Sequence, residues 1–152
     1  MKIEVLKPEY LITTFFGSGY FPVASGTFAS LVALLPLLLV DNDFHYLFFP
    51  ISIIIAIVSI PLIKKVEREK GNDSPIIVID EVIGVWLIFS SPIIIFNWIN
   101  VILGIMLFRF FDIFKPWIIS KINSKRGSIY VLLDDIIAAL FTSIILHIVM
   151  LL

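Results

Sequence analysis

The sequence contains no cysteine among its 152 residues, and charged residues make up only 15% of it. Without cysteine the chain can form no disulfide, no thiolate metal site and no cysteinyl-phosphate intermediate. The formal net charge is −1, and the basic residues stand in short groups rather than in one long stripe. This pattern lacks the electrostatic footprint of a nucleic-acid-binding protein, so we expect no nucleic acid as partner.

Apolar residues make up 60% of the chain, and the mean hydropathy is +1.10. This composition is typical of an integral membrane protein, so we expect the bilayer to be its surroundings. The length predicts one domain over residues 1–152. An apolar run at residues 10–16 is short for a signal peptide and leads into glycines, so we interpret the N-terminus as retained.

Two apolar runs in the first half of the chain differ in length. Residues 28–40 would form a helix of roughly 20 Å, which is short for a hydrocarbon core of roughly 30 Å. Residues 44–63 supply a full-length span, which Pro50 and Pro61 would kink. A basic segment at residues 64–70 follows, and its four cations predict the cytoplasmic side of the membrane. The Glu and Lys spacing in this segment favours a solvated helix face over a binding patch.

Ser74 and Pro75 have the pattern of a helix start, with serine as N-cap and proline at the first helical position. Residues 82–108 are too long for one comfortable crossing and short for two, and a break at residues 90–92 predicts a hairpin or re-entrant pair. The apolar runs together predict an all-α fold, a small polytopic membrane bundle of about four or five membrane-embedded helices, some short or re-entrant. A second basic cluster should share the cytoplasmic side and comprises Lys121, Lys125 and Arg126.

Two pairs of adjacent acids interrupt apolar runs, Asp80 with Glu81 and Asp134 with Asp135. An ionised group in such a run costs about 2.5–3.5 kcal/mol on insertion scales unless a cation or a proton pairs with it. Each pair lies six and seven residues beyond a serine, which for the second pair is Ser128 at the expected start of the last helix. The two segments align without a gap and predict acidic pairs at equal depth on two helices, through duplication or a shared requirement.

The embedded ionisable groups are five acids and two bases, namely Asp80, Glu81, Arg109, Asp112, Lys115, Asp134 and Asp135. A divalent cation would offset the excess negative charge, and oxygen ligands without histidine or cysteine nearby predict Mg²⁺ rather than Zn²⁺ or copper. Arg109, Asp112 and Lys115 recur every third residue and would share one broad helix face. Arg109 and Lys115 are available to hold a phosphate, and a spare carboxylate could act as base or nucleophile.

A loop at residues 17–27 contains three glycines, a proline and several hydroxyl groups. If Ser25 or Thr27 caps the helix that follows, the loop presents backbone N–H groups and the positive end of the helix dipole to an anion. A membrane-entry turn whose glycines permit positive φ accounts for the same residues equally well.

Two further interpretations of the acids remain open. The pairs could form interhelical salt bridges with Arg109 and Lys115, although burying five acids for structure alone is costly. They could also bind the coupling ion of a small ion-coupled membrane transporter. Short spans with polar residues gathered towards one side favour an interfacial site over a path through the membrane. His147 has no acid near it in sequence, so we expect a packed or interfacial residue rather than a ligand.

Four motifs, at residues 17–31, 79–84, 108–117 and 133–135, occur in the order found in the bacterial phosphatidylglycerophosphatase A family, which the chain resembles. The resemblance implies an all-helical fold and Mg²⁺-dependent hydrolysis of the terminal phosphate of phosphatidylglycerophosphate, giving phosphatidylglycerol. It further implies a multi-pass protein of the bacterial cytoplasmic (inner) membrane whose active site faces the cytoplasm. Ser25 stands where the family usually has proline, which bears on the rigidity of the loop.

On this hypothesis the metal lies between the acidic pairs, with Asp80 and Asp135 facing each other across it. The candidate metal ligands are Asp80, Glu81, Asp134 and Asp135. The candidate catalytic acids are these four and Asp112, with base and nucleophile unassigned. The candidate phosphate-binding residues are Gly17, Gly19, Ser25, Gly26, Thr27, Arg109 and Lys115. Gly84, one turn beyond Asp80, would let a neighbouring helix approach closely. The oligomeric state stays open.

Overall fold

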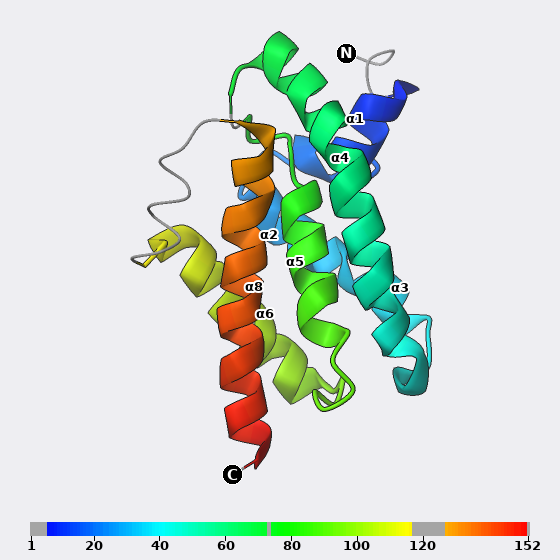
Figure 1. The fold of residues 1–152 in the computed structure, drawn as a ribbon, viewed down its shortest axis with the longest axis vertical. Coiled ribbons are helices and arrows are strands. Elements are labelled where there is room, and N and C mark those ends of the chain that lie inside the picture. Colours follow the sequence, from blue (N-terminus) through cyan, green and yellow to red (C-terminus); the bar gives the residue numbers. More distant parts are fainter. Residues whose placement is uncertain (1–5, 73, 117–126, 152) are drawn as a thin grey trace.

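The computed structural model describes residues 6–72, 74–116 and 127–151, and the regular elements within them are all helices, as predicted. Figure 1 shows these helices packed as one bundle, with the two chain ends at opposite ends of it. The predicted basic cluster of Lys121, Lys125 and Arg126 lies outside the described residues. In chain order the elements are α1 (Pro8–Thr13), η2 (Ser18–Tyr20), α2 (Ser25–Val32), α3 (Leu34–Leu38), η3 (Asn42–Leu47), α4 (Phe48–Lys70), α5 (Ile79–Phe89), α6 (Trp98–Phe114) and α8 (Ser128–Leu151).

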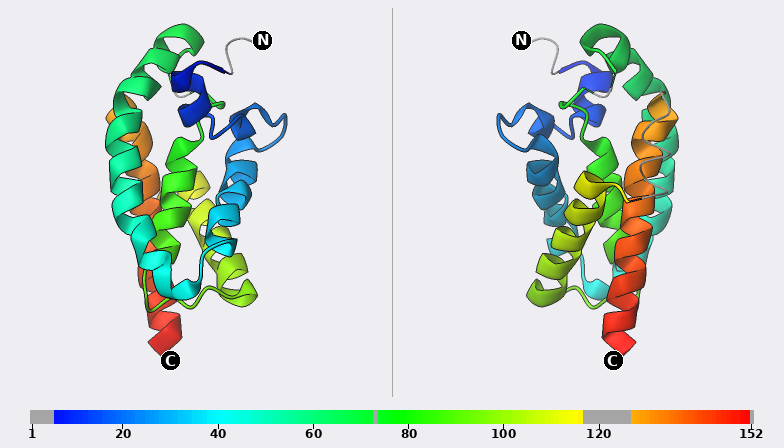
Figure 2. Two further views of the ribbon diagram at one scale, coloured as in Figure 1. Left: turned by 90° about the vertical axis from the view of Figure 1, so that its right-hand side faces the viewer. Right: turned by 90° about the vertical axis from the view of Figure 1, so that its left-hand side faces the viewer.

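Helix α5 is the centre of the bundle. It packs most extensively on α8 and also contacts α4, α2 and α6. Figure 2 shows it enclosed between α4 and α8 on one side and α2 and α6 on the other. At Gly84 an added Cβ would come within 2.6 Å of the Phe108 ring on α6, so only glycine lets the two helices approach this closely. The predicted role of Gly84 in helix packing is confirmed.

Two helices in the described part of the chain are long and apolar enough to cross a membrane, Asn42–Lys70 and Ser128–Leu151. The first joins η3 to α4, and only 22% of its most apolar stretch is buried. Its outward side chains include Phe49, Ile54 and Ile57, each more than half exposed. Two such helices are fewer than the four or five predicted, because α2, α3, α5 and α6 each have 17 residues or fewer.

The apolar run at residues 28–40 does not form one helix. It is divided between α2 and α3, which meet at Ala33. Pro36 has no N–H to donate to the carbonyl one turn earlier, which interrupts the helical hydrogen bonds at this point. At the junction itself, the Ala33 carbonyl accepts a hydrogen bond of 2.8 Å from Nε1 of Trp86 on α5. The break therefore attaches this arm of the molecule to the central helix.

The predicted hairpin is confirmed, because α5 ends at Phe89 and α6 begins at Trp98. The Asn97 side chain caps α6 by accepting a hydrogen bond of 2.9 Å from the backbone N–H of Asn100. In the turn, Ser91 Oγ lies 2.9 Å from Nε2 of His147 on α8. As expected, His147 is a packed residue, and it links the hairpin turn to the last helix.

The start of α5 differs from the prediction. Ser74 and Pro75 lie outside the helix, which begins at Ile79 with Val78 as N-cap. The preceding segment is held from outside instead. The Val78 N–H donates to the Thr13 carbonyl at 2.9 Å, and Ser25 Oγ donates to the Pro75 carbonyl at 2.7 Å. These tertiary hydrogen bonds hold residues 74–78 in a non-helical path, against the local capping pattern.

The later start of α5 changes the depth of the first acidic pair. Asp80 and Glu81 lie in the first turn of α5, whereas α8 begins at Ser128 and carries Asp134 and Asp135 about two turns further on. The prediction that both pairs lie at equal depth on their helices is therefore wrong. The pairs still meet in space, because α5 and α8 start at different levels of the bundle (Figure 1).

Candidate active site

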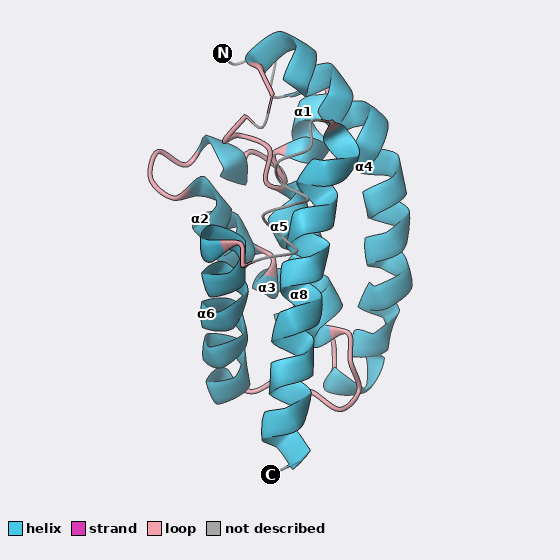
Figure 3. Cartoon of the chain, turned by 60° about the vertical axis from the view of Figure 1, so that its left-hand side comes forward, coloured by secondary structure: helices cyan, strands magenta, loops and turns pink. Residues whose placement is uncertain are grey.

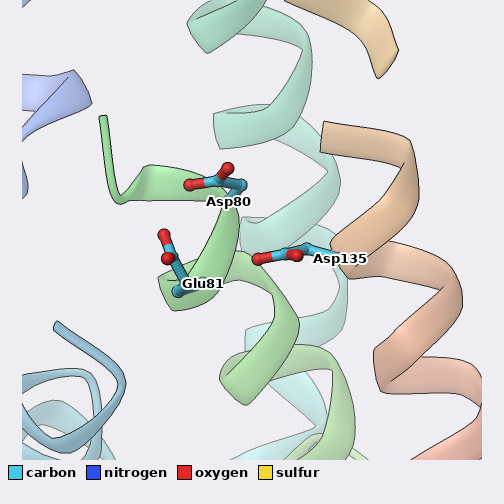
Figure 4. A group of neighbouring side chains, drawn as sticks. All are labelled: Asp80, Glu81 and Asp135. Atoms are coloured by element: carbon cyan, nitrogen blue, oxygen red, sulfur yellow. The ribbon is translucent and has the colours of Figure 1, made fainter. Parts of the chain in front are cut away.

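Three carboxylates converge between the start of α5 and the second turn of α8. Asp80 and Glu81 come from α5 and Asp135 from α8, and each offers an oxygen atom within 4.8 Å of the others. Figure 4 shows the three side chains turned towards one another across the gap between the two helices. We call this group the carboxylate triangle. Sequence analysis predicted that Asp80 and Asp135 would face each other across a metal ion. The structure brings their carboxylates together, and the ion stays a prediction.

The triangle contains buried oxygen atoms without hydrogen-bond partners among the described residues. These atoms are Oδ1 of Asp80, Oε2 of Glu81 and Oδ2 of Asp135. Burial, and next the neighbouring Glu81 carboxylate, raise the pKa of Asp80 well above its usual range. Leaving several buried carboxylate oxygens without a partner is costly, so the arrangement calls for a cation or for protons. Three carboxylates without nitrogen or sulfur donors fit a hard divalent cation such as Mg²⁺.

Helix α6 brings two bases and one acid to the edge of the triangle. Arg109 Nη1 lies 2.6 Å from Oδ2 of Asp112 and 3.5 Å from Oε1 of Glu81. Lys115 Nζ lies 3.8 Å from Oδ1 of Asp112 and also forms an ion pair with Oδ2 of Asp134 on α8. The prediction of one shared helix face is confirmed for Arg109 and Asp112, whereas Lys115 is the C-cap residue beyond α6, in the left-handed region. Asp112 lies between the two cations and contacts both.

Asp134 and Asp135 are adjacent in sequence but have different surroundings. Asp135 belongs to the carboxylate triangle, whereas Asp134 is outside that group and pairs with Lys115. Successive residues on a helix point about 100° apart, so one side chain faces α5 while the other faces α6. Of the four candidate metal ligands, the structure therefore brings Asp80, Glu81 and Asp135 together and directs Asp134 to a lysine.

The glycine loop reaches the site only with its last part. Helix α2 begins at Ser25, and its N-cap is Ala24 in the left-handed region, so neither predicted cap, Ser25 or Thr27, occupies the N-cap position. An added Cβ at Gly26 would overlap Oε1 of Glu81 and lie 3.1 Å from Nη1 of Arg109. Glycine is therefore needed at this position for α2 to approach the charged pair.

The other loop residues serve different contacts. Gly17 has a φ of 91°, which suits the turn before η2. An added Cβ at Gly19 would overlap the Ile76 carbonyl, so this glycine allows close packing against the segment before α5. Gly17, Gly19 and Thr27 do not line the site cavity. Of the predicted phosphate-binding residues in the loop, the structure brings only Ser25 and Gly26 to it.

A cavity of about 250 Å³ joins these groups. Four helices and the segment before α5 contribute to its wall, although the four motifs are far apart in the sequence. The sequence did not point to Ala24, Pro75, Ile77 and Val131 as lining residues, because their side chains have no reactive or charged group. Ser74 was predicted only as a helix cap. The lining residues are Ala24, Ser25, Gly26, Ser74, Pro75, Ile77, Asp80, Glu81, Arg109, Asp112, Lys115, Val131, Asp134 and Asp135.

Comparison with known proteins gives concordant matches over nearly the whole chain. The family model for phosphatidylglycerophosphatase A matches residues 11–150. A phosphatidylglycerophosphatase A of Haemophilus influenzae is 31% identical over 148 residues, covering 95% of this chain and 90% of the relative. The Escherichia coli protein of the same name is 28% identical over 150 residues, covering 96% of this chain and 86% of the relative.

A third relative carries a different name. It is a Bacteroides thetaiotaomicron protein provisionally named a phosphatidylinositol-3-phosphatase, 32% identical over 142 residues, covering 90% of this chain and 89% of the relative. No solved structure matches the chain significantly. The family match covers all four motifs whose residues meet in the cavity. The chain therefore belongs to the phosphatidylglycerophosphatase A family.

Proposed function

We propose that this protein is a Mg²⁺-dependent phosphatase that converts phosphatidylglycerophosphate into phosphatidylglycerol and inorganic phosphate. Membership of the family makes it a phosphoric monoester hydrolase. One structural observation links the proposal to particular residues. Side chains from α2, α5, α6 and α8 meet in one cavity, where three carboxylates lie next to an arginine and a lysine. Each of these three carboxylates has an oxygen with no hydrogen-bond partner among the residues that the structure describes.

The carboxylate triangle would hold the metal ion. Asp80, Glu81 and Asp135 provide the oxygen donors that Mg²⁺ prefers, and their unpartnered oxygens give the ion direct ligands. When bound, the ion would supply positive charge to a phosphoryl oxygen or to the attacking water. In the net reaction the water oxygen bonds to phosphorus, the ester P–O bond breaks, and the departing glycerol oxygen takes a proton.

The phosphate would be held by groups beside the carboxylate triangle. Arg109 offers a planar fork and Lys115 a point charge, and the first N–H groups of α2 at Ser25 and Gly26 point out of a helix N-terminus. Asp112 contacts both cations and would fix their spacing.

The position of the cavity supports an active site on the cytoplasmic side of a bacterial membrane. Ser128 Oγ donates a hydrogen bond of 2.7 Å to Oε2 of Glu67, which attaches the start of α8 to the basic end of α4. Asp134 and Asp135 follow about two turns along α8. The active-site cavity is thus near the end of α4 that carries Lys64, Lys65, Arg68 and Lys70, the end expected to face the cytoplasm.

Neither a purely structural role nor ion transport fits the geometry of the acids as well. If the acids only formed interhelical salt bridges, their oxygens would be paired, yet oxygens of Asp80, Glu81 and Asp135 have no hydrogen-bond partner among the described residues. An ion-coupled transporter would need the acids on a route through the bilayer. Here they share one cavity with Arg109 and Lys115, a combination that suits a phosphate better than a coupling cation alone.

A phosphate-release assay in detergent tests the proposal, because a phosphatase needs no sealed compartment and a transporter does. The purified protein is given Mg²⁺ and, in separate reactions, phosphatidylglycerophosphate, phosphatidylinositol 3-phosphate or phosphatidic acid. We expect fastest release from phosphatidylglycerophosphate and none after chelation of the metal. Faster release from phosphatidylinositol 3-phosphate would correct the substrate, and no release from any of the three lipids would contradict the proposed activity.

A further inference from the structure

A second and larger cavity lies between the C-terminal part of α4 and the start of α8. Its volume is about 520 Å³, and it shares no lining residue with the active-site cavity. Figure 3 shows α8 beside α4, the two helices that are long and apolar enough to cross a membrane. We call it the α4–α8 cavity. Its lining residues are Ile60, Lys64, Glu67, Arg68, Asn72, Gly127, Ser128, Ile129 and Tyr130.

The charge of the α4–α8 cavity is positive. Lys64 and Arg68 are one helical turn apart on α4, both are exposed, and neither forms a salt bridge with a described acid. Glu67 is the acid among the lining residues, and it accepts the hydrogen bond from Ser128. The cavity is therefore lined by two cations and by one acid, and the acid already accepts a hydrogen bond. This excess of positive charge would attract an anion.

The surface leading to the cavity is apolar. Ile53, Ile57, Ile60 and Lys64 are spaced four, three and four residues apart and so follow one face of α4. Ile53 and Ile57 are exposed by 42% and 64%. This face changes from isoleucine to cation within one helical turn. Such a change matches the passage from the hydrocarbon core of a bilayer to its headgroups. A molecule with an acyl chain and an anionic head matches both parts.

We infer that the α4–α8 cavity binds the phosphodiester headgroup of an anionic bilayer phospholipid, at a site separate from the active site. Lys64 and Arg68 hold the phosphate, and an acyl chain lies along Ile53 and Ile57. Basic pockets between membrane helices on the cytoplasmic side are suited to such headgroups. Binding of this lipid in the α4–α8 cavity does not depend on which reaction the active site catalyses. The basic segment would then be more than the solvated face that its spacing predicts.

The test uses phosphatidylserine, whose phosphate is a diester and so offers no phosphomonoester to the active site. Lipid binding to the detergent-solubilised full chain is measured by native mass spectrometry for the wild type and two double variants. Lys64→Gln with Arg68→Gln removes the two cavity cations. Lys7→Gln with Lys65→Gln is the matched control, since it removes the same charge from exposed residues outside the cavity.

We expect the Lys64→Gln/Arg68→Gln variant to bind phosphatidylserine about 30-fold more weakly than the wild type, because each of the two cations near a headgroup contributes about 1 kcal/mol. The control variant should bind as the wild type does. Phosphatidylcholine, whose choline cation offsets the charge of its phosphate, should show a smaller loss in the Lys64→Gln/Arg68→Gln variant than phosphatidylserine does. Equal affinity in the two double variants would overturn the inference. Displacement of the bound lipid by inorganic phosphate would also overturn it, because the site would then select the free anion.

Discussion

Lys115, at the C-terminal end of α6, forms an ion pair with Asp134 of α8, and this contact separates Asp134 from the carboxylate triangle. The neighbouring Asp135 turns to Asp80 and Glu81 instead. Two adjacent aspartates thus serve two parts of the same cavity. In the proposed function, Asp135 is a ligand of the metal ion. Asp134 instead positions Lys115, which binds the phosphate.

Replacement of Asp134 with Asn should weaken substrate binding rather than metal binding. Loss of the charge partner frees Lys115 from its fixed position, so we expect the KM for phosphatidylglycerophosphate to rise about tenfold. The Mg²⁺ concentration for half-maximal activity should stay within about threefold of the wild-type value. The measurement is phosphate release as a function of substrate and of Mg²⁺. A Mg²⁺ requirement shifted as strongly as in Asp135→Asn would instead identify Asp134 as a ligand.

Replacement of Asp80 or Asp135 with Asn should abolish Mg²⁺-dependent phosphate release, by a factor of at least about 100, because each removes a charged donor of the triangle. Membrane insertion and helical content should be unchanged, as measured by fractionation and circular dichroism. Asp41→Asn is the matched control, since Asp41 is exposed and does not line the cavity. Full activity in both triangle variants would show that the triangle is not the metal site.

Mg²⁺ should raise the thermal stability of the wild-type protein in detergent without any substrate. A ligand that binds only the folded state stabilises it by about 2.7 kcal/mol at a concentration 100 times its Kd. The stabilisation should be lost in Asp135→Asn and kept in Asp134→Asn. Thermal unfolding followed by intrinsic fluorescence, with and without Mg²⁺, measures this directly. Equal stabilisation of all three proteins would place the ion outside the triangle.

Replacement of Gly26 with Ala should lower kcat/KM by about 100-fold with little loss of stability. The new methyl group would overlap Oε1 of Glu81, a flexible side chain that can move aside, but its movement displaces a metal donor and its contact with Arg109. Glu81→Asp shortens this side chain by one methylene and removes the overlap.

A double-mutant cycle therefore tests the Gly26 contact. In Gly26→Ala with Glu81→Asp, the loss of kcat/KM should be smaller than the product of the two single losses, because the residues are in contact. Activity of the purified variants is compared at equal Mg²⁺. Losses that simply multiply would mean that Gly26 affects the reaction through another route.

Local patterns predicted the helical class, the hairpin break near Ser91, the start of α8 at Ser128 and the shared helix face of Arg109 and Asp112. These features depend on composition and on the period of a helix, which are properties of short segments. The charged residues that line the cavity were also named from the sequence, because acids and bases in apolar runs need partners.

The start of α5, by contrast, could not be predicted from its own segment. Ser74 and Pro75 have a valid capping pattern, yet Thr13 and Ser25 form hydrogen bonds with the backbone there and delay the helix to Ile79. Similarly, the predicted cradle over residues 17–27 reaches the cavity only at Ser25 and Gly26, because the earlier glycines serve the turn before η2 and the packing on the segment before α5.

The sequence by itself determined that five acids and two bases lie within or beside apolar runs, where each needs a partner of opposite charge. Only the tertiary structure decided how they divide. Asp134 and Asp135 differ by about 100° around their helix axis, and the element that each one meets depends on where α5 and α6 pack against α8. That packing is set by contacts between distant segments, such as Gly84 against Phe108, which no local pattern contains.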